Sequence, residues 1–333
     1  MPVPAASAHA LRVAVACLAA CVVACGATGQ APATGQSPAR AGAQAAPPVS
    51  TAPVPAFDGA RAWAHLERQV EIGPRPSGSE AIAETRAYIR AQLAEAGVET
   101  REQAFTAMTP LGPVAMANVI GVIPGARPER IALASHYDTK LFEEFRFVGA
   151  NDGGSSTAAL IELGRSLAGR QNAFTIELIF FDGEEARRKE WADLDNTYGS
   201  RHYVTAAQKD GSLEGLEALV LLDMVGDREL RMRKELASTP WLVDLIWETA
   251  GRLGHRATFV NDYASIADDH VPFLQAGIPA ADLIDLETPT DRNSWHTEAD
   301  NLENVSQRSL QIVGDVVLAA LPDIEAWLLS GPR

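Results

Sequence analysis

The sequence predicts one α/β domain with a mixed, mostly parallel central sheet flanked by helices. Three observations support this fold class. Apolar strand-like runs alternate with amphipathic helical patterns from residue 58 onward, which is typical of a parallel sheet covered on both faces. Two neighbouring strand-like runs between residues 98 and 124 indicate an antiparallel edge. The same region shows no internal repeat and no second linker, so a single domain is expected.

The globular pattern opens with two helices. Four apolar residues of segment 58–73 share one helical face: Ala62, Trp63, Leu66 and Val70. The second helix is expected over 79–97, with Ser79 as its N-cap and Gly97 at its end.

Strands and helices then alternate to the end of the chain. Strands are expected at 98–105, 114–125, 130–138, 174–185, 216–227 and 279–287. Helices are expected at 155–170, 198–208, 239–254 and roughly 305–330.

The first 56 residues have a different composition. The apolar stretch at 11–25 is too short for a comfortable membrane span and is typical of a secretory signal. It holds all three cysteines, and Cys21 and Cys25 each end a lipobox-like run. We expect an exported lipoprotein anchored at Cys25, with Cys21 or an ordinary secretory signal as the alternatives. Residues 26–56 then form a flexible Ala/Pro/Gly-rich linker, and 57–333 form the catalytic domain.

Charge and cysteine content narrow the possible functions. The net charge of −15 argues against nucleic-acid binding and provides no polybasic surface for lipid, so membrane contact is expected only through the N-terminal anchor. Beyond residue 25 the sequence contains no cysteine, which excludes a disulfide or a thiolate metal site in the domain. The sequence gives no indication of oligomeric state.

Acidic and imidazole side chains gather where the predicted strands end. They are His136 and Asp138, Asp152, Glu184 and Glu185, Asp223, the run Asp268–Asp269–His270, and Trp295–His296. Ligands of open α/β sheets bind beyond the carboxyl ends of the strands, so these groups are expected in one cleft. Carboxylates and imidazoles without thiolate suit a catalytic Zn²⁺ site with an open coordination position.

The adjacent acids Glu184 and Glu185 fit the same hypothesis, since a divalent cation relieves the repulsion between clustered carboxylates. In an extended segment their side chains point opposite ways, so one can face the metal and the other the substrate. Motifs of other chemistries, such as GxSxG, HExxH and GxGxxG, are absent from the sequence.

These motifs, in this order, resemble the M28 family of zinc enzymes over nearly all of residues 58–330. The resemblance implies a zinc-exopeptidase-like fold and one of two activities on peptides with a free N-terminus. Aminopeptidases of this kind use two zinc ions, bridged by Asp152, with a second metal on His136 and Asp223. Glutaminyl-peptide cyclotransferases use one zinc, which maps onto Asp152, Glu185 and His296.

The resemblance favours the cyclotransferase, which converts N-terminal glutamine to pyroglutamate and releases ammonia. The resemblance to cyclotransferases implies that Glu184 carries a proton from the attacking amine to the leaving nitrogen. It also implies that Asp268 and Asp223 share a proton. Substrate contacts are then expected from Trp191, Trp295 and His270. The zinc aminopeptidase is the main alternative, and a tethered binding domain without catalysis is a third.

Overall fold

The computed structural model describes residues 56–192, 194–286 and 294–331. The predicted signal segment and all but the last residue of the linker lie outside these ranges. Among the described helices, none is both long enough and apolar enough to cross a membrane.

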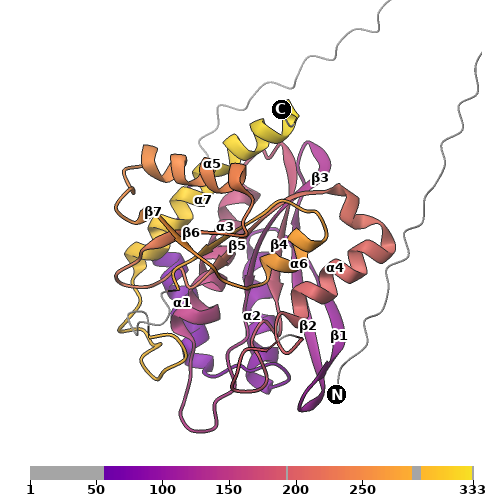
Figure 1. Cartoon of the computed structure of the whole chain (residues 1–333), viewed down its shortest axis with the longest axis vertical. Coiled ribbons are helices and arrows are strands. Elements are labelled where there is room, and N and C mark those ends of the chain that lie inside the picture. Colours follow the sequence, from indigo (N-terminus) through magenta and orange to yellow (C-terminus); the bar gives the residue numbers. More distant parts are fainter. Residues whose placement is uncertain (1–55, 193, 287–293, 332–333) are drawn as a thin grey trace, which may run out of the picture. The chain divides into compact units, whose positions relative to one another are not determined.

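A six-stranded mixed sheet forms the centre of the domain (Figure 1). In spatial order its strands are β1 (Glu99–Thr109), β2 (Gly112–Ile123), β4 (Phe174–Phe181), β3 (Arg127–His136), β5 (Leu216–Asp223) and β8 (Ala280–Ile284). The last four run parallel, whereas β2 is antiparallel to both β1 and β4. The expected mixed sheet with an antiparallel edge is therefore confirmed.

The register brings the carboxyl ends of the parallel strands together. His136, the last residue of β3, pairs with Phe181, the last residue of β4. On the other side, Ala134 pairs with Leu221, so β5 ends with Asp223 beside the end of β3. The polar residues that follow these strands therefore meet at one edge of the sheet.

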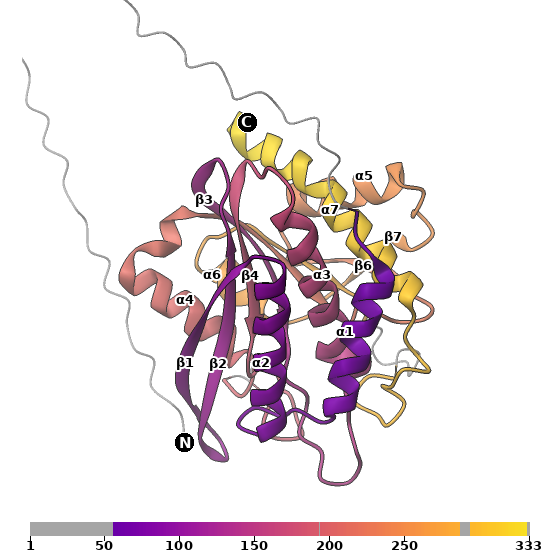
Figure 2. The same cartoon turned by 180° about the vertical axis from the view of Figure 1, so that it is seen from behind.

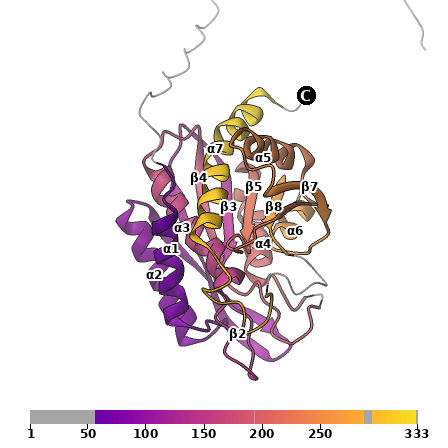
Figure 3. The same ribbon diagram turned by 90° about the vertical axis from the view of Figure 1, so that its left-hand side faces the viewer.

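Helices cover both faces of the sheet. Side chains alternate along β3, so that Ile131 and Leu133 enter one apolar core while Ala132 and Ala134 enter the other. The first core is covered by α1 (Gly59–Ile72), α2 (Glu80–Glu95), α3 (Ser156–Ala168), α5 (Pro240–Arg252) and α7 (Gln307–Ser330). Figure 2 shows α1, α2, α3 and α7 from outside. The second core is covered by α4 (Tyr198–Asp210) and α6 (His270–Gln275), which lie toward the right in Figure 3, opposite α1 and α2.

Side-chain caps begin the first two helices, and the cap of α2 is the one predicted from the sequence. Asp58 caps α1 by accepting the amide of Ala60 at 2.9 Å, and Ser79 caps α2 by accepting that of Ile82 at 3.1 Å. Gly97 follows α2 with a φ of 77°, a backbone conformation that glycine adopts without strain. Ala62 and Leu66 are fully buried, as the helical pattern predicted.

The short elements that were not predicted include β6 (Met232–Glu235), β7 (Phe259–Ala264) and α6. β6 and β7 form a separate two-stranded parallel sheet. Both are at most six residues long, β6 is mostly charged and β7 is interrupted by Asn261 and Asp262, so neither shows a clear apolar period.

The prediction placed Glu184 and Glu185 at the end of an extended strand, and this is wrong. β4 ends at Phe181, and Gly183 follows with a φ of 81°. The two acids therefore leave the sheet through a turn, and a turn rather than strand alternation separates their side chains.

Candidate metal centre and its pocket

The first group of possible metal ligands consists of Asp152, Glu185 and His296. Their donor atoms all lie within 4.8 Å of one another. His296 Nε2 is 3.1 Å from Glu185 Oε1 and 3.4 Å from Asp152 Oδ2. Asp152 Oδ2 and Glu185 Oε2 are buried and have no hydrogen-bond partner, which is unfavourable unless another group binds them. Two carboxylates and one imidazole match the donor set of a catalytic zinc ion.

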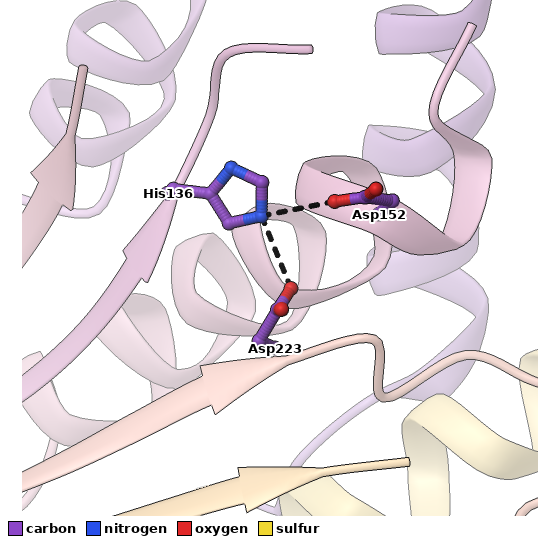
Figure 4. A group of neighbouring side chains, drawn as sticks. All are labelled: His136, Asp152 and Asp223. Carbon is purple, nitrogen blue, oxygen red and sulfur yellow. Dashed lines mark hydrogen bonds and ion pairs between the residues drawn. The ribbon is translucent and has the colours of Figure 1, made fainter. Parts of the chain in front are cut away.

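A second group shares Asp152 and adds His136 and Asp223 (Figure 4). His136 Nε2 lies 3.3 Å from Asp152 Oδ1 and 3.1 Å from Asp223 Oδ1. Asp152 thus directs one carboxylate oxygen toward each group. This arrangement suits a carboxylate that bridges two metal ions, and equally a mononuclear site in which His136 hydrogen-bonds to the acids.

Asp138 fixes the turn that carries Glu184 and Glu185. Its carboxylate accepts the amide of Glu184 at 3.1 Å and that of Glu185 at 3.3 Å. The same carboxylate lies 3.5 Å from His136 Nδ1. One buried side chain therefore positions the acid pair and orients the imidazole.

The turn directs the two adjacent acids toward different neighbours. Glu185 faces His296 and lies 3.8 Å from the buried ammonium of Lys140. Glu184 instead has His136 Nδ1 at 3.8 Å. The two side chains thus point toward different neighbours, and the turn after β4 is the cause.

Burial and neighbouring charges shift the pKa values of these groups. Burial raises the pKa of Glu184 well above its ordinary value, and Asp268 and Glu185 add to the effect while His136 opposes it. Burial, reinforced by Asp223, raises the pKa of Asp268 to about 7. Burial disfavours the charged form of His296, but Glu185 and Asp152 outweigh this and raise its pKa to about 10. Without a metal, the site thus contains carboxyl groups that bind protons near neutral pH.

A pocket of about 200 Å³ opens over these groups. Its acidic and imidazole wall is formed by Asp152, Glu184, Glu185, Asp223, Asp268 and His296. The rest of its lining is mainly apolar and consists of Trp191, Trp295, Met224, Ser265, Ile266, Ala267, Ile284 and Leu286. An apolar cleft with a few convergent polar groups is the usual form of a small-molecule site.

The structure brings together nearly all of the residues that the sequence pointed to. Trp191 and Trp295 lie at the pocket with 39% and 36% of their surface exposed. The Trp295 ring stacks on His296 with 4.1 Å between ring centroids.

His270 is the exception among the expected site residues. It is fully buried and does not line the pocket. Its Nε2 lies 3.2 Å from Glu235 Oε2 and its Nδ1 lies 3.6 Å from Asp282 Oδ2. Because α6 begins at His270 and turns this ring inward, His270 supports the segment that carries Asp268 and does not face a substrate.

Several residues that shape the site were not identified from the sequence. Phe142 and Phe147 pack against His296 at ring-centroid distances of 5.6 and 5.8 Å. Asp300 accepts the amides of Asn151 and Asp152. The only sequence signal for Asp300 is its position four residues after a candidate ligand, which is weak evidence alone.

Comparisons with known proteins agree with this geometry. The model of peptidase family M28 matches residues 118–321. A glutaminyl-peptide cyclotransferase-like protein of Mus musculus is 32% identical, and the match covers 75% of this chain and 71% of that protein.

Two solved structures show the same fold. An Acidobacteriales bacterium glutaminyl cyclase is 36% identical with a TM-score of 0.78, over 85% of this chain and 99% of that one. A Bacteroides thetaiotaomicron protein described as a leucine aminopeptidase precursor is 27% identical with a TM-score of 0.73, over 81% and 98% of the two chains.

Proposed function

Since the chain belongs to peptidase family M28, we propose that it is a zinc-dependent glutaminyl-peptide cyclotransferase. It would convert an N-terminal glutamine of a peptide into pyroglutamate and release ammonia. The observation that carries the proposal is the combination of the Asp152–Glu185–His296 donor set with a small pocket walled by two tryptophans. The similarity to cyclotransferases in both sequence and structure supports it.

Asp152, Glu185 and His296 would hold one zinc ion, and the two buried carboxylate oxygens without a hydrogen-bond partner fit such an ion. When bound, zinc supplies a Lewis acid that polarises the γ-carboxamide oxygen of the substrate glutamine. The remaining chemistry falls to side chains of this chain.

Glu184 is the proposed proton carrier. The substrate α-amine attacks the carboxamide carbon, so a C–N bond forms, the bond to the carboxamide nitrogen breaks, and that nitrogen leaves as ammonia. One proton must move from the attacking nitrogen to the leaving nitrogen. Glu184 lies in the pocket wall, where a carboxylate can first accept a proton and then return it.

Asp268 and Asp223 form the second part of the proposed proton network. Both line the pocket, and the charge of Asp223 helps to raise the pKa of Asp268. The two acids would therefore share a proton and titrate as a pair. In this state the pair can hydrogen-bond to the carboxamide nitrogen and to Glu184.

Trp191 and Trp295 would enclose the glutamine side chain. Their partial exposure places them at the mouth, where a bound substrate covers them and water is displaced. Exclusion of water favours cyclisation because water at the same position would lead to hydrolysis.

The test is mass spectrometry on one Gln-initiated and one Leu-initiated peptide incubated with the zinc-loaded protein. Loss of one ammonia from the Gln peptide, with the Leu peptide unchanged, is the expected result. Glu184→Gln should lower kcat by about 10²- to 10⁴-fold, the usual contribution of a general acid–base group, while zinc binding persists. Removal of the first residue from either peptide would reject the proposal.

A dinuclear zinc aminopeptidase is the second candidate. The observation that favours it is the intact His136–Asp152–Asp223 group, which offers donors for a second ion. Metal analysis separates the two candidates, since one bound zinc per active chain supports the cyclotransferase and two support the peptidase.

The N-terminal segment leads to a proposal about location. We propose that the chain is exported and anchored through a lipidated Cys25, with the linker at 26–56 holding the domain away from the membrane. Metabolic labelling with a fatty-acid analogue should modify the wild-type chain and not a Cys25→Ser variant. Labelling that persists in Cys25→Ser and disappears in Cys21→Ser would move the anchor to Cys21.

A further inference from the structure

Asp300 connects two segments that both supply candidate zinc ligands. It lies four residues after His296, and its side chain is almost completely buried. Its carboxylate accepts the amide of Asn151 at 2.6 Å and that of Asp152 at 3.1 Å. Its backbone carbonyl accepts the amide of Ala150 at 3.4 Å. One residue of segment 296–300 (the His296 segment) thus accepts hydrogen bonds from three consecutive amides of loop 148–152 (the Asp152 loop).

Arg75 holds the other end of the same loop. Its fully buried guanidinium donates to the carbonyls of Val148 at 2.6 Å, Gly149 at 2.9 Å and Tyr137 at 2.9 Å. The Asp152 loop therefore lies between a cation that binds its carbonyls and an anion that binds its amides. Each of the two side chains hydrogen-bonds to peptide groups of the loop, which offsets part of the cost of burying it.

The short segment from His296 to Asp300 is a compact turn. Thr297 donates its amide to the carbonyl of Ser294 at 3.2 Å, and Asp300 donates its amide to that of Thr297 at 3.1 Å. The Thr297 hydroxyl also binds the carbonyl of Ser294 at 2.7 Å. These contacts tie Asp300 to the backbone that presents the His296 ring, so the two residues are held in a fixed relation.

We propose that Asp300 is a positioning residue that sets the distance between Asp152 and His296 in the metal centre. Both ligands lie on segments outside the strands, and His296 Nε2 and Asp152 Oδ2 are 3.4 Å apart. Asp300 fixes the backbone amide of Asp152 itself, whereas Arg75 fixes the carbonyls before it. The inference rests on the proposed zinc site, but not on which reaction the zinc serves.

Asp195 provides a matched control. It is also buried, and it accepts two consecutive amides, those of Arg187 and Arg188, each at 3.0 Å. Its loop carries Trp191 at the pocket and none of the three candidate zinc ligands. Asp195→Asn and Asp300→Asn therefore impose the same chemical change on two different loops. In each variant, one carboxylate oxygen that accepts a hydrogen bond from a backbone N–H is replaced by an NH₂ group, which cannot accept that bond.

The experiment measures zinc affinity by competition with a chelator for the wild-type chain and both variants. Loss of a group that orients a metal ligand typically weakens metal binding about 10- to 100-fold, and we expect this loss in Asp300→Asn alone. The visible absorption spectrum of the cobalt-substituted protein reports ligand geometry. It should change in Asp300→Asn and match the wild type in Asp195→Asn. For Asp195→Asn we expect a raised KM with the wild-type zinc affinity.

Zinc affinity within twofold of the wild type, together with an unchanged cobalt spectrum, in a folded Asp300→Asn variant would overturn the inference. Equal loss of affinity in both variants would do the same, because it would show a general loss of packing. If Asp300→Asn does not fold, Asp300→Glu keeps the charge and lengthens the side chain by one methylene, and the same two readings apply to it. None of these readings requires turnover, so failure of the proposed reaction would leave the result interpretable.

Discussion

Neighbouring residues of the same type have separate tasks in this site because their surroundings differ. Burial and the charge of Asp152 raise the pKa of Glu185, and His296 and Lys140 oppose this shift by favouring its charged form. Burial and the surrounding acids raise the pKa of Glu184 well above its ordinary value, and His136 opposes them. The pair shows that a carboxylate's role follows from which charges face it, and its position in the sequence indicates only that it lies near the site.

His65, remote from the metal ligands, should make stability depend on pH. Burial, with the charge of Arg61, lowers its pKa to about 4, and its Nδ1 lies 2.8 Å from the hydroxyl of Tyr88. The folded chain therefore holds this ring neutral, whereas the unfolded chain protonates it below about pH 6.5. Stability from this group is complete above pH 6.5 and is lost as the pH falls toward 4.

Urea unfolding of the wild type and His65→Gln at pH 8 and pH 5 measures this contribution. The wild-type advantage over the variant should shrink by about 2 kcal/mol at pH 5, since one pKa unit corresponds to about 1.4 kcal/mol. Acid effects on the metal centre are common to both proteins and cancel in the difference. An advantage that is the same at both pH values would contradict the prediction.

At the scale of elements, the turn after β4 determines where the acid pair lies. Gly183 has a φ of 81°, and a Cβ added there would lie 2.5 Å from the sulfur of Met116. Gly183→Ala should therefore destabilise the fold by more than the roughly 1–2 kcal/mol of left-handed strain alone. It should also lower kcat, because Glu184 is the next residue.

Gly211→Ala is the control for this prediction. Gly211 has nearly the same φ, 79°, and a Cβ there would meet nothing within 4 Å. It should lose only the strain energy and retain kcat. Thermal melts together with steady-state kinetics on both variants make the comparison, and equal effects would argue against a special role for the turn after β4.

The elements that could be predicted are those with a long apolar pattern. β4 and β5 are largely apolar, β3 contains the apolar run 131–134, and α1 and α2 have side-chain caps, so local sequence patterns are sufficient to predict them. β6 and β7 depend on each other for pairing and lack such a pattern. The ligand positions could be inferred because polar residues directly follow strands.

Asp300 could not be found in the same way. Its partners, Asn151 and Asp152, lie almost 150 residues earlier in the chain, and only the tertiary fold brings them together. Nor could the inward turn of His270 be read from the sequence, because its partner Glu235 lies on an unpredicted strand.

For the whole molecule, metal removal should lower stability markedly. The buried acids of the pocket repel one another when charged, and among the described residues that line it His296 is the only one that can carry a positive charge. Free zinc at 100 times its Kd should stabilise the fold by about 2.7 kcal/mol relative to the chelated protein. For a domain of this size that corresponds to a rise in Tm on the order of 5–10 °C, which calorimetry can measure.

Two controls distinguish this effect from general ion binding. Magnesium prefers an all-oxygen octahedral shell and should give little of the stabilisation. A His296→Ala variant should respond much less to zinc, since it lacks one of the three ligands. A chelated protein that melts at the same temperature as the zinc-loaded one would contradict the proposed centre.

Asp152 belongs to both donor groups, which bears on how the number of bound metal ions could change during evolution. A protein with separate sites would need new ligands to gain a second ion, but here the donors for both ions are already in place around one shared carboxylate. Solved structures described as a glutaminyl cyclase and as a leucine aminopeptidase precursor both share this fold, so the same scaffold occurs under both descriptions.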